Sequence, residues 1–200
     1  MISVYNVKPK FQQLLKPVME FLHRNNFTPN QVTMLALIGS IATGVFVYFD
    51  KGWFYLWVVP FYLLVRMALN AIDGMMARAY NLQSPLGEVL NELGDVLADL
   101  AIFYPILLKF GMDKYPNLLA AFIALMIINE FVGVLGKAMG GARRYDGPMG
   151  KSDRALFIGL LCIIVFFIPM VLSWIYYLIL IVILAMLLST IARIKNSLHT

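Results

Sequence analysis

The stretch that decides the fold is WFYLWVVPFYLLVRMALNAIDGMMARAY, residues 53–80. It begins as an apolar run long enough to cross a bilayer, because an α-helix rises about 1.5 Å per residue and the hydrocarbon core is about 30 Å thick. Toward its end, however, it carries Arg66, Asn70, Asp73 and Arg78. A charged group within a membrane costs at least about 2.5–3.5 kcal/mol on insertion scales, so these side chains need compensating partners.

The rest of the chain repeats this membrane-spanning pattern. Of its 200 residues, 61% are hydrophobic and only 14% are charged, which excludes an ordinary soluble domain. Long apolar runs occur at 32–49, 53–72, 86–108, 117–136, 155–172 and 174–192. We therefore predict an all-α integral membrane protein with six transmembrane helices. It forms one domain over residues 1–200, with the helix bundle at 27–197.

The N-terminal segment, residues 1–26, has the pattern of an amphipathic juxtamembrane helix. Its apolar residues recur at helical spacing between lysines: Val4, Val7, Phe11, Leu14, Leu15, Val18 and Phe21 alternate with Lys8, Lys10 and Lys16. Such a helix lies in the headgroup layer of the bilayer. We expect Pro9 and Pro17 to break it into pieces.

Basic residues predict the orientation in the membrane. Twelve of them fall on one side of the predicted bundle and three, Lys51, Lys109 and Lys114, on the other. Because Lys and Arg concentrate in cytoplasmic loops, both termini and the loops at 78–86 and 137–154 are predicted to face the cytoplasm.

Six of the eleven acidic residues lie in or beside predicted spans: Asp73, Glu88, Glu92, Asp95, Asp99 and Glu130. At helical spacing, Asn70, Asp73 and Ala77 share one face of the second span. The third span carries Glu88, Asn91, Glu92, Asp95 and Asp99 within a sector of about 100°. A short turn joins the two spans, so the polar faces of two antiparallel helices converge near the cytoplasmic surface.

Oxygen side chains that converge in this way suit Mg²⁺ or Mn²⁺, which would also hold a phosphate. Small residues beside the acids, namely Gly74, Ala77, Gly87 and Gly94, leave room for a ligand between the helices. Close helix packing explains one or two of these small residues, but not the whole set.

At this point the sequence resembles the CDP-alcohol phosphatidyltransferase family, whose signature is D-x-x-D-G-x-x-A-R-x8-G-x3-D-x3-D. Here the pattern is N-x-x-D-G-x-x-A-R-x8-G-x3-N-x3-D, with Asn70, Asp73, Gly74, Ala77, Arg78, Gly87, Asn91 and Asp95 in register. Asn70 and Asn91 replace the first and third aspartates of the signature. A bacterial subgroup of the family has a sequence motif similar to this variant, so the resemblance implies a bacterial plasma membrane protein.

The resemblance implies a reaction and a site. CDP-diacylglycerol would donate its phosphatidyl group to a small alcohol and release CMP, with Gly74, Ala77, Arg78 and Gly87 around the CDP moiety. One or two ions of Mg²⁺ or Mn²⁺ would be held by Asn70, Asp73, Asn91 and Asp95. Asp95 would act as general base on the acceptor hydroxyl. The expected partners are these substrates, the bilayer and a second copy of the chain in a homodimer, and no nucleic acid.

The acceptor is the least determined part. Five cations follow the fourth span, and the corresponding family region contributes to the acceptor pocket. We therefore expect Arg143, Arg144, Lys151 and Arg154 to bind an anionic acceptor such as a polyol phosphate or an amino acid. The same cations also fit the bias of cytoplasmic loops and attraction to anionic lipid.

Other interpretations of the sequence stay open. Asp73 and Asp95 could pair with Arg66 or Arg78 to hold helices together. Asp99 could ligate the metal, support its ligands or pair with Arg66, and Glu130 could serve helix packing or the acceptor pocket. The whole chain could be a non-catalytic relative that binds CDP-lipid, because two aspartates are missing, or a cation- or proton-coupled transporter.

Overall fold

The computed structural model describes residues 7–198, with side chains from residue 11 onward, and all regular structure in this part of the chain is helical. The helices are α1 (Val7–Arg24), α2 (Pro29–Phe49), α3 (Tyr55–Ala79), α4 (Pro85–Lys109), η2 (Met112–Lys114), α5 (Pro116–Ala138), α6 (Lys151–Phe167), η3 (Pro169–Trp174) and α7 (Ile175–Ser197). The all-α prediction is confirmed. The predicted contributions of the Val4, Val7, Lys8 and Lys10 side chains to an amphipathic face lie outside the described residues.

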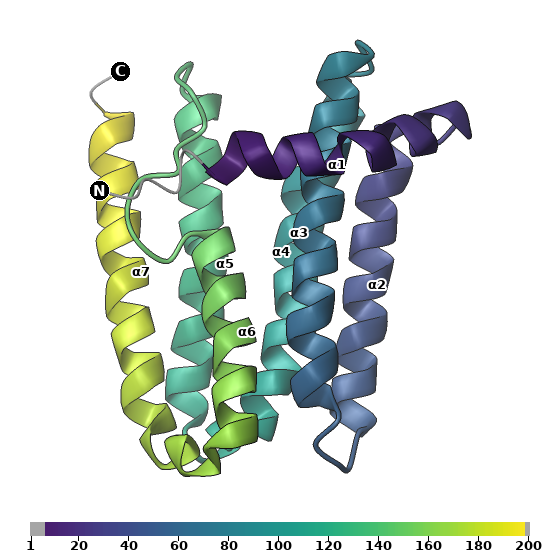
Figure 1. Ribbon diagram of the computed structural model, residues 1–200. Helices are drawn as coiled ribbons and strands as arrows, with labels where there is room; N and C mark the ends of the chain where they lie inside the picture. The colour runs from purple at the N-terminus through teal and green to yellow at the C-terminus, as the bar shows by residue number, and fades with distance from the viewer. Residues whose placement is uncertain (1–6, 199–200) are drawn as a thin grey trace.

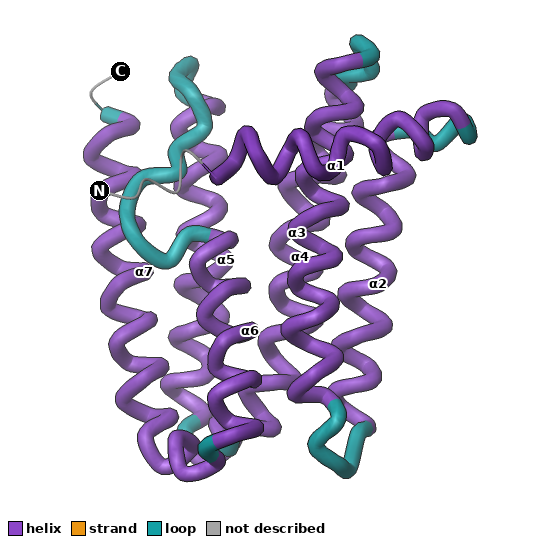
Figure 2. Tube along the Cα trace, viewed as in Figure 1, coloured by secondary structure: helices purple, strands orange, loops and turns teal. Residues whose placement is uncertain are grey.

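The long helices α2 to α7 stand side by side, and α1 lies across one end of the bundle (Figure 1). That end also carries the turn between α3 and α4 and the long loop between α5 and α6, and α7 ends there (Figure 2). We call it the α1 end. Residues 70–80 and 85–95 therefore come together at the same end of the bundle as the basic loop 139–150.

Four segments are long and apolar enough to cross a membrane: Pro29–Phe49, Tyr55–Ala79, Pro116–Ala138 and Pro169–Ser197. The outward surfaces of the helices are also apolar, with exposed side chains such as Phe61, Leu64, Ile181, Leu188 and Ile191. Such a surface would be costly in water and is stable against lipid tails. The chain is therefore an integral membrane protein. The two remaining long helices are less apolar (α4, with its acids) or shorter (α6, with 17 residues).

Helix starts follow the capping signals of the sequence. Thr28 caps α2, and its hydroxyl accepts from the backbone N–H of Gln31 while Gln31 reciprocates. Ser84 caps α4 in the same way through the N–H of Gly87. Each cap is followed by a proline at the first helical position, where no backbone donor is needed.

The predicted break in the N-terminal helix is wrong, because α1 runs through Pro17 without interruption. A proline inside a helix removes one backbone hydrogen bond, and packing compensates for that loss here. Leu15 and Met19 are buried against Val32 of α2 and Ile72 and Met76 of α3.

Two predicted span boundaries also differ from the structure. The second span continues to Ala79, well beyond residue 72, so the signature residues lie on a regular helix. The fifth span ends at Phe167 and not at residue 172, since Pro169 starts the 3-10 helix η3.

The apolar core occupies the half of the bundle remote from α1. Its fully buried members come from all six helices α2 to α7 and include Val47, Leu56, Val59, Ile102, Phe103, Phe122, Ile158, Cys162 and Ile179. The buried charged side chains lie, by their positions along α3 to α7, in the middle of the bundle or nearer its α1 end: Arg66, Asp73, Asp95, Asp99, Glu130, Arg154 and Arg193. The bundle is thus apolar at one end and polar inside at the other.

Among the described glycines, Gly44 of α2 leaves the least room for a side chain beside a neighbouring helix. A Cβ built there would lie 1.9 Å from the backbone oxygen of Ala101 on α4, which only a shift of the helices could relieve. We expect Gly44→Ala to destabilise the protein by about 1–3 kcal/mol, as other overpacked cores do. Thermal unfolding in detergent micelles measures this.

The matched control is Gly94→Ala on α4, where the nearest atom to the added Cβ is Thr33 Cγ2 at an ordinary 3.8 Å. It should leave the midpoint within error of the wild type. Equal stability of the two variants would contradict the close α2–α4 packing.

Candidate active site

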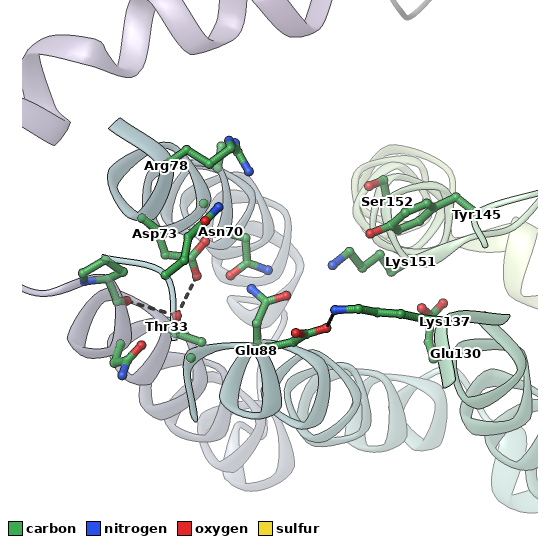
Figure 3. Close-up of a pocket in the computed structure, with 18 of the residues that line it drawn as sticks. Thr33, Asn70, Asp73, Arg78, Glu88, Glu130, Lys137, Tyr145, Lys151 and Ser152 are labelled. Carbon is green, nitrogen blue, oxygen red and sulfur yellow. Dashed lines mark hydrogen bonds and ion pairs between the residues drawn. The ribbon is translucent and has the colours of Figure 1, made fainter. Parts of the chain in front are cut away.

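A cavity of about 1080 Å³ opens at the α1 end of the bundle. Two sets of residues face each other across it (Figure 3). The signature wall consists of signature residues from α3 and α4: Asn70, Asp73, Gly74, Ala77, Arg78, Gly87 and Asn91. The basic wall comes from α5, the following loop, α6 and α7, and consists of Glu130, Lys137, Tyr145, Lys151, Ser152 and Arg193. Phe11 and Gln12 of α1 also line the cavity.

Asp73 is buried in the signature wall, with 3% of its surface exposed. Its Oδ2 accepts a hydrogen bond of 2.7 Å from the Thr33 hydroxyl of α2 (Figure 3). Its Oδ1 is buried and has no hydrogen-bond partner among the described residues. An unpartnered buried carboxylate oxygen is costly, so this atom is a candidate ligand for a cation.

Asp95 lies behind the cavity surface rather than on it, between α3, α4 and α6. Asn70 donates to its Oδ1 at 2.7 Å, and Arg66 lies 3.5 Å from the same oxygen. The ammonium of Lys151 forms an ion pair with the other oxygen. The predicted convergence of the two polar faces therefore involves Asn70 and Asp95 directly, with Asp73 one helical turn from Asn70.

The oxygen donors of this region suit a hard divalent cation. Asp73, Asn70 and Asn91 line the cavity, and Asp95 contacts Asn70. Among residues 11–198, no three His, Cys, Asp or Glu side chains are grouped closely enough to form a metal site by themselves. A site here would thus need the amide oxygens as well as the carboxylates, which agrees with the orphaned Oδ1 of Asp73.

The four residues predicted around a CDP group all line the same wall. Gly74, Ala77 and Arg78 follow Asp73 along α3, and Gly87 lies in the first turn of α4. The Arg78 guanidinium is exposed and forms no hydrogen bond or ion pair with any residue between 11 and 198. It is therefore available to an anion in the cavity.

The four predicted acceptor cations are not all at the cavity. Only Lys151 lines it, whereas Arg143, Arg144 and Arg154 are engaged elsewhere. Arg143 donates to Glu92 at 2.7 Å and to Glu130 at 3.0 Å. Arg144 donates to the backbone oxygen of Asn196 on α7.

Arg154 is fully buried in a chain of ion pairs that crosses the bundle. It donates to Asp99 of α4 at 3.0 Å and to Glu130 of α5 at 3.1 Å. Asp99 in turn pairs with Arg66 of α3 at 2.6 Å. The expected pairing of Asp99 with Arg66 is thus the one observed among the three alternatives for Asp99.

Glu130 joins this chain to the loop and to α7, through Arg143 and through Arg193 at 3.6 Å. In the loop, burial alone would lower the pKa of the Arg143 guanidinium, but its hydrogen bond with Glu92 raises that pKa overall. Arg143 therefore remains a cation that ties Glu92 of α4 to Glu130 of α5. Glu130 therefore takes part in helix packing, and it also lines the cavity.

Sequence reasoning missed several residues of the cavity. Asn30 and Thr33 are polar residues about one turn apart in the first turns of α2, and this spacing was a detectable signal. Arg193 was counted only as a basic residue of the tail, and Tyr145 and Ser152 gave no signal. Their placement depends on how the loop 139–150 folds back over the bundle.

The buried charge chain generates a stability prediction. Arg154→Met would remove one buried partner from Asp99, which keeps Arg66, and one from Glu130, which keeps Arg143 and Arg193. The loss of these charge-assisted hydrogen bonds in the interior should cost about 1.5–3 kcal/mol or more. Arg78→Met removes an exposed, unpaired cation and should change stability by less than about 0.5 kcal/mol. A thermal melt of both variants in detergent checks this, and an unchanged midpoint for Arg154→Met would contradict the network.

Comparison with known proteins agrees with this geometry. The sequence model of the CDP-alcohol phosphatidyltransferase family matches residues 26–194. This all-helical membrane protein with a polar cavity at one end therefore has the sequence pattern of the CDP-alcohol phosphatidyltransferases. The chain belongs to this family of phospholipid biosynthetic enzymes.

Two relatives and two solved structures illustrate the likeness. The chain is 40% identical to the inner membrane protein YnbA of Escherichia coli K12 over 173 residues, which cover 86% of this chain and 85% of that protein. It is 29% identical to the phosphatidylinositol phosphate synthase of Mycobacterium tuberculosis H37Rv over 152 residues, covering 74% and 68% of the two chains.

Crystal structures of the phosphatidylinositol phosphate synthase PgsA1 of Mycobacterium tuberculosis share the fold. The structure with CDP-DAG bound has a TM-score of 0.73 at 22% identity, over 92% of this chain and 94% of that one. The structure in complex with manganese and citrate has a TM-score of 0.73 at 20% identity, over 92% and 88%.

Proposed function

We propose that this protein transfers the phosphatidyl group of CDP-diacylglycerol to a small anionic alcohol and releases CMP. The observation that carries the proposal is the signature wall, in which all the predicted CDP residues and three of the four predicted metal ligands line one cavity. The fourth ligand, Asp95, is one hydrogen bond away through Asn70. The single domain of residues 1–200 would contain the whole site.

Gly74 supports a nucleotide on the signature wall. A Cβ there would meet only the movable guanidinium of Arg78, at 3.4 Å, so helix packing does not require a glycine. Gly44 is the opposite case, because backbone fills the space beside it. No neighbouring protein atom excludes a side chain at Gly74, which lies on the wall of the cavity. Its lack of a side chain is therefore consistent with close approach of a ligand to the backbone.

The donor set supports a divalent metal, Mg²⁺ or Mn²⁺, held by Asp73 and Asp95 with the side-chain oxygens of Asn70 and Asn91. When bound, such an ion neutralises and polarises the diphosphate. The complex of a structural neighbour with manganese agrees with this assignment. Arg78, which is free and faces the same cavity, would contribute a second positive charge to the phosphates.

Asp95 is the proposed general base. Its carboxylate is held by Asn70 and Lys151 from two sides, which fixes its direction. It would take the proton of the acceptor hydroxyl as that oxygen forms a bond to the lipid-side phosphorus. The bond between this phosphorus and the CMP oxygen breaks, and CMP leaves.

The basic wall is the proposed acceptor site. Lys137 and Lys151 face the cavity together with Ser152 and Arg193. The pair between Lys137 and Glu88 is half exposed, so its ammonium can exchange a carboxylate for an anionic acceptor at little cost. Arg143, Arg144 and Arg154 would act indirectly, by holding the loop and the charge chain behind this wall.

We further propose the complete disposition in the membrane. Six helices, α2 to α7, would span a bacterial plasma membrane, because α4 and α6 stand alongside the four apolar spans and the acids inside the bundle are paired with arginines. The α1 end would face the cytoplasm, with α1 in the headgroup layer. The chain would form a homodimer, as the family resemblance implies.

A non-catalytic relative that binds CDP-lipid is the second candidate. Asn70 and the contact of Lys151 with Asp95 favour it, because together they occupy both oxygens of the proposed base.

The deciding assay follows CMP and lipid products from purified protein in nanodiscs with CDP-diacylglycerol, Mg²⁺ or Mn²⁺ and a panel of alcohols. We expect metal-dependent CMP release, and Asp95→Asn should lower it on the order of 10²-fold or more, as loss of a general base does. Asp113→Asn, in η2 at the opposite end of the bundle, is the matched control and should retain full activity.

Release that survives Asp95→Asn would overturn the base assignment. No release with any acceptor would favour the non-catalytic relative, and ion flux in liposomes would favour the transporter.

The acceptor assignment has its own test. Lys137→Met should raise the KM for an anionic acceptor at least about tenfold, because a charge-assisted hydrogen bond of about 1.5–3 kcal/mol is lost. The KM for CDP-diacylglycerol should stay unchanged, as should turnover of an uncharged alcohol. Equal effects on charged and uncharged acceptors would contradict an anionic substrate.

A further inference from the structure

Lys151 lies beside Asp95, one of the two signature carboxylates, Asp73 and Asp95, that are proposed to bind the metal. Its ammonium pairs with Oδ2 of Asp95, while Asn70 donates to Oδ1 at 2.7 Å. Both oxygens of Asp95 therefore have partners from the protein itself. Asp73 differs, because its Oδ1 is buried and has no partner among the described residues.

The charges around this point leave room for one divalent cation. Asp73 and Asp95 contribute two negative charges, and Asn70 and Asn91 contribute none. Asp99 is already neutralised by Arg66, and the charge of Arg154 is shared with Glu130. With Lys151 the local charge is about −1, so one divalent ion would bring it to about +1, a value that suits a diphosphate. A second ion would face an excess of positive charge with no free carboxylate to receive it.

The position of Lys151 is fixed by the fold. It is the first residue of α6, and the next turn of that helix is anchored by the buried ion pairs of Arg154 with Asp99 and Glu130. Only 28% of the Lys151 side chain is exposed. A tethered cation loses less entropy on pairing than a free ion, so Lys151 competes well for Asp95.

We infer that this enzyme holds a single divalent cation at Asp73, Asn70 and Asn91. Asp95, which the proposed function also counts among the metal ligands, would instead pair with the Lys151 ammonium, which acts as a built-in second cation. The inference rests on the proposed function for the presence of a metal. The inference explains why Asn can stand at both the first and the third signature position. Because Lys151 supplies a positive charge in place of a second metal ion, the site needs fewer negatively charged ligands.

The experiment counts bound Mn²⁺ and needs no turnover. Purified protein in nanodiscs of phosphatidylcholine, which carries no net charge, is titrated with Mn²⁺ alone, and free Mn²⁺ is followed by its electron paramagnetic resonance signal. We expect one ion per chain for the wild type and for Lys151→Arg. Lys151→Gln keeps a donor toward Asp95 but removes the charge, and it should bind two ions per chain.

Arg78→Met is the matched control, since it removes one positive charge from the same cavity without releasing a carboxylate from an ion pair. It should bind one ion. Should Lys151→Gln fail to fold, Asn91→Asp tests the same claim, because a third carboxylate at the site should admit a second ion in the presence of Lys151.

Two ions in the wild type, or one ion in both Lys151→Gln and Asn91→Asp, would overturn the inference while leaving the proposed function intact. No bound Mn²⁺ in any variant would overturn the metal site together with the inference. Failure of the transferase proposal would appear separately, as the absence of CMP release.

Discussion

The structure depends on the neutralisation of acids inside a bundle that faces lipid. Asp95, Asp99 and Glu130 are almost fully buried, and each would be costly to ionise alone. Arg66 and Arg154 join α3, α4, α5 and α6 through these acids. Because every member of this chain of ion pairs has a partner, the four helices that carry these charges can pack together inside a bundle that faces lipid. The cavity at the α1 end is the space that this packing leaves open.

Within that cavity, Asp73 and Asp95 have different environments. Asp73 faces the cavity with one oxygen free, whereas Asp95 is held by a lysine and an amide. The first arrangement suits a metal ligand, and the second suits a carboxylate oriented for proton transfer. The proposed division of roles follows from these contacts. In this division the signature wall holds the phosphatidyl donor, and the basic wall holds the acceptor.

Much of this was predictable from the sequence, because helical periodicity and residue spacing are local. The spacing of Asn70, Asp73, Asn91 and Asp95 indicated two facing polar stripes, and the caps at Thr28 and Ser84 set the helix starts. Which arginine would pair with which buried acid could not be derived from the sequence, since it depends on how the helices are rotated about their axes against one another. Arg154 was therefore expected at the cavity, although it lies behind it, and the continuity of α1 through Pro17 depends on tertiary packing.

The most direct test of the proposed metal site is a structure determined from crystals grown with Mn²⁺ and CDP-diacylglycerol, with anomalous diffraction data at the manganese edge. We predict an anomalous peak within about 2.0–2.6 Å of a carboxylate oxygen of Asp73, the distance at which oxygen ligands bind hard cations, with the diphosphate beside it. A peak placed instead on Glu88, Glu92 or Glu130, or no peak while CDP-diacylglycerol is bound, would contradict this site.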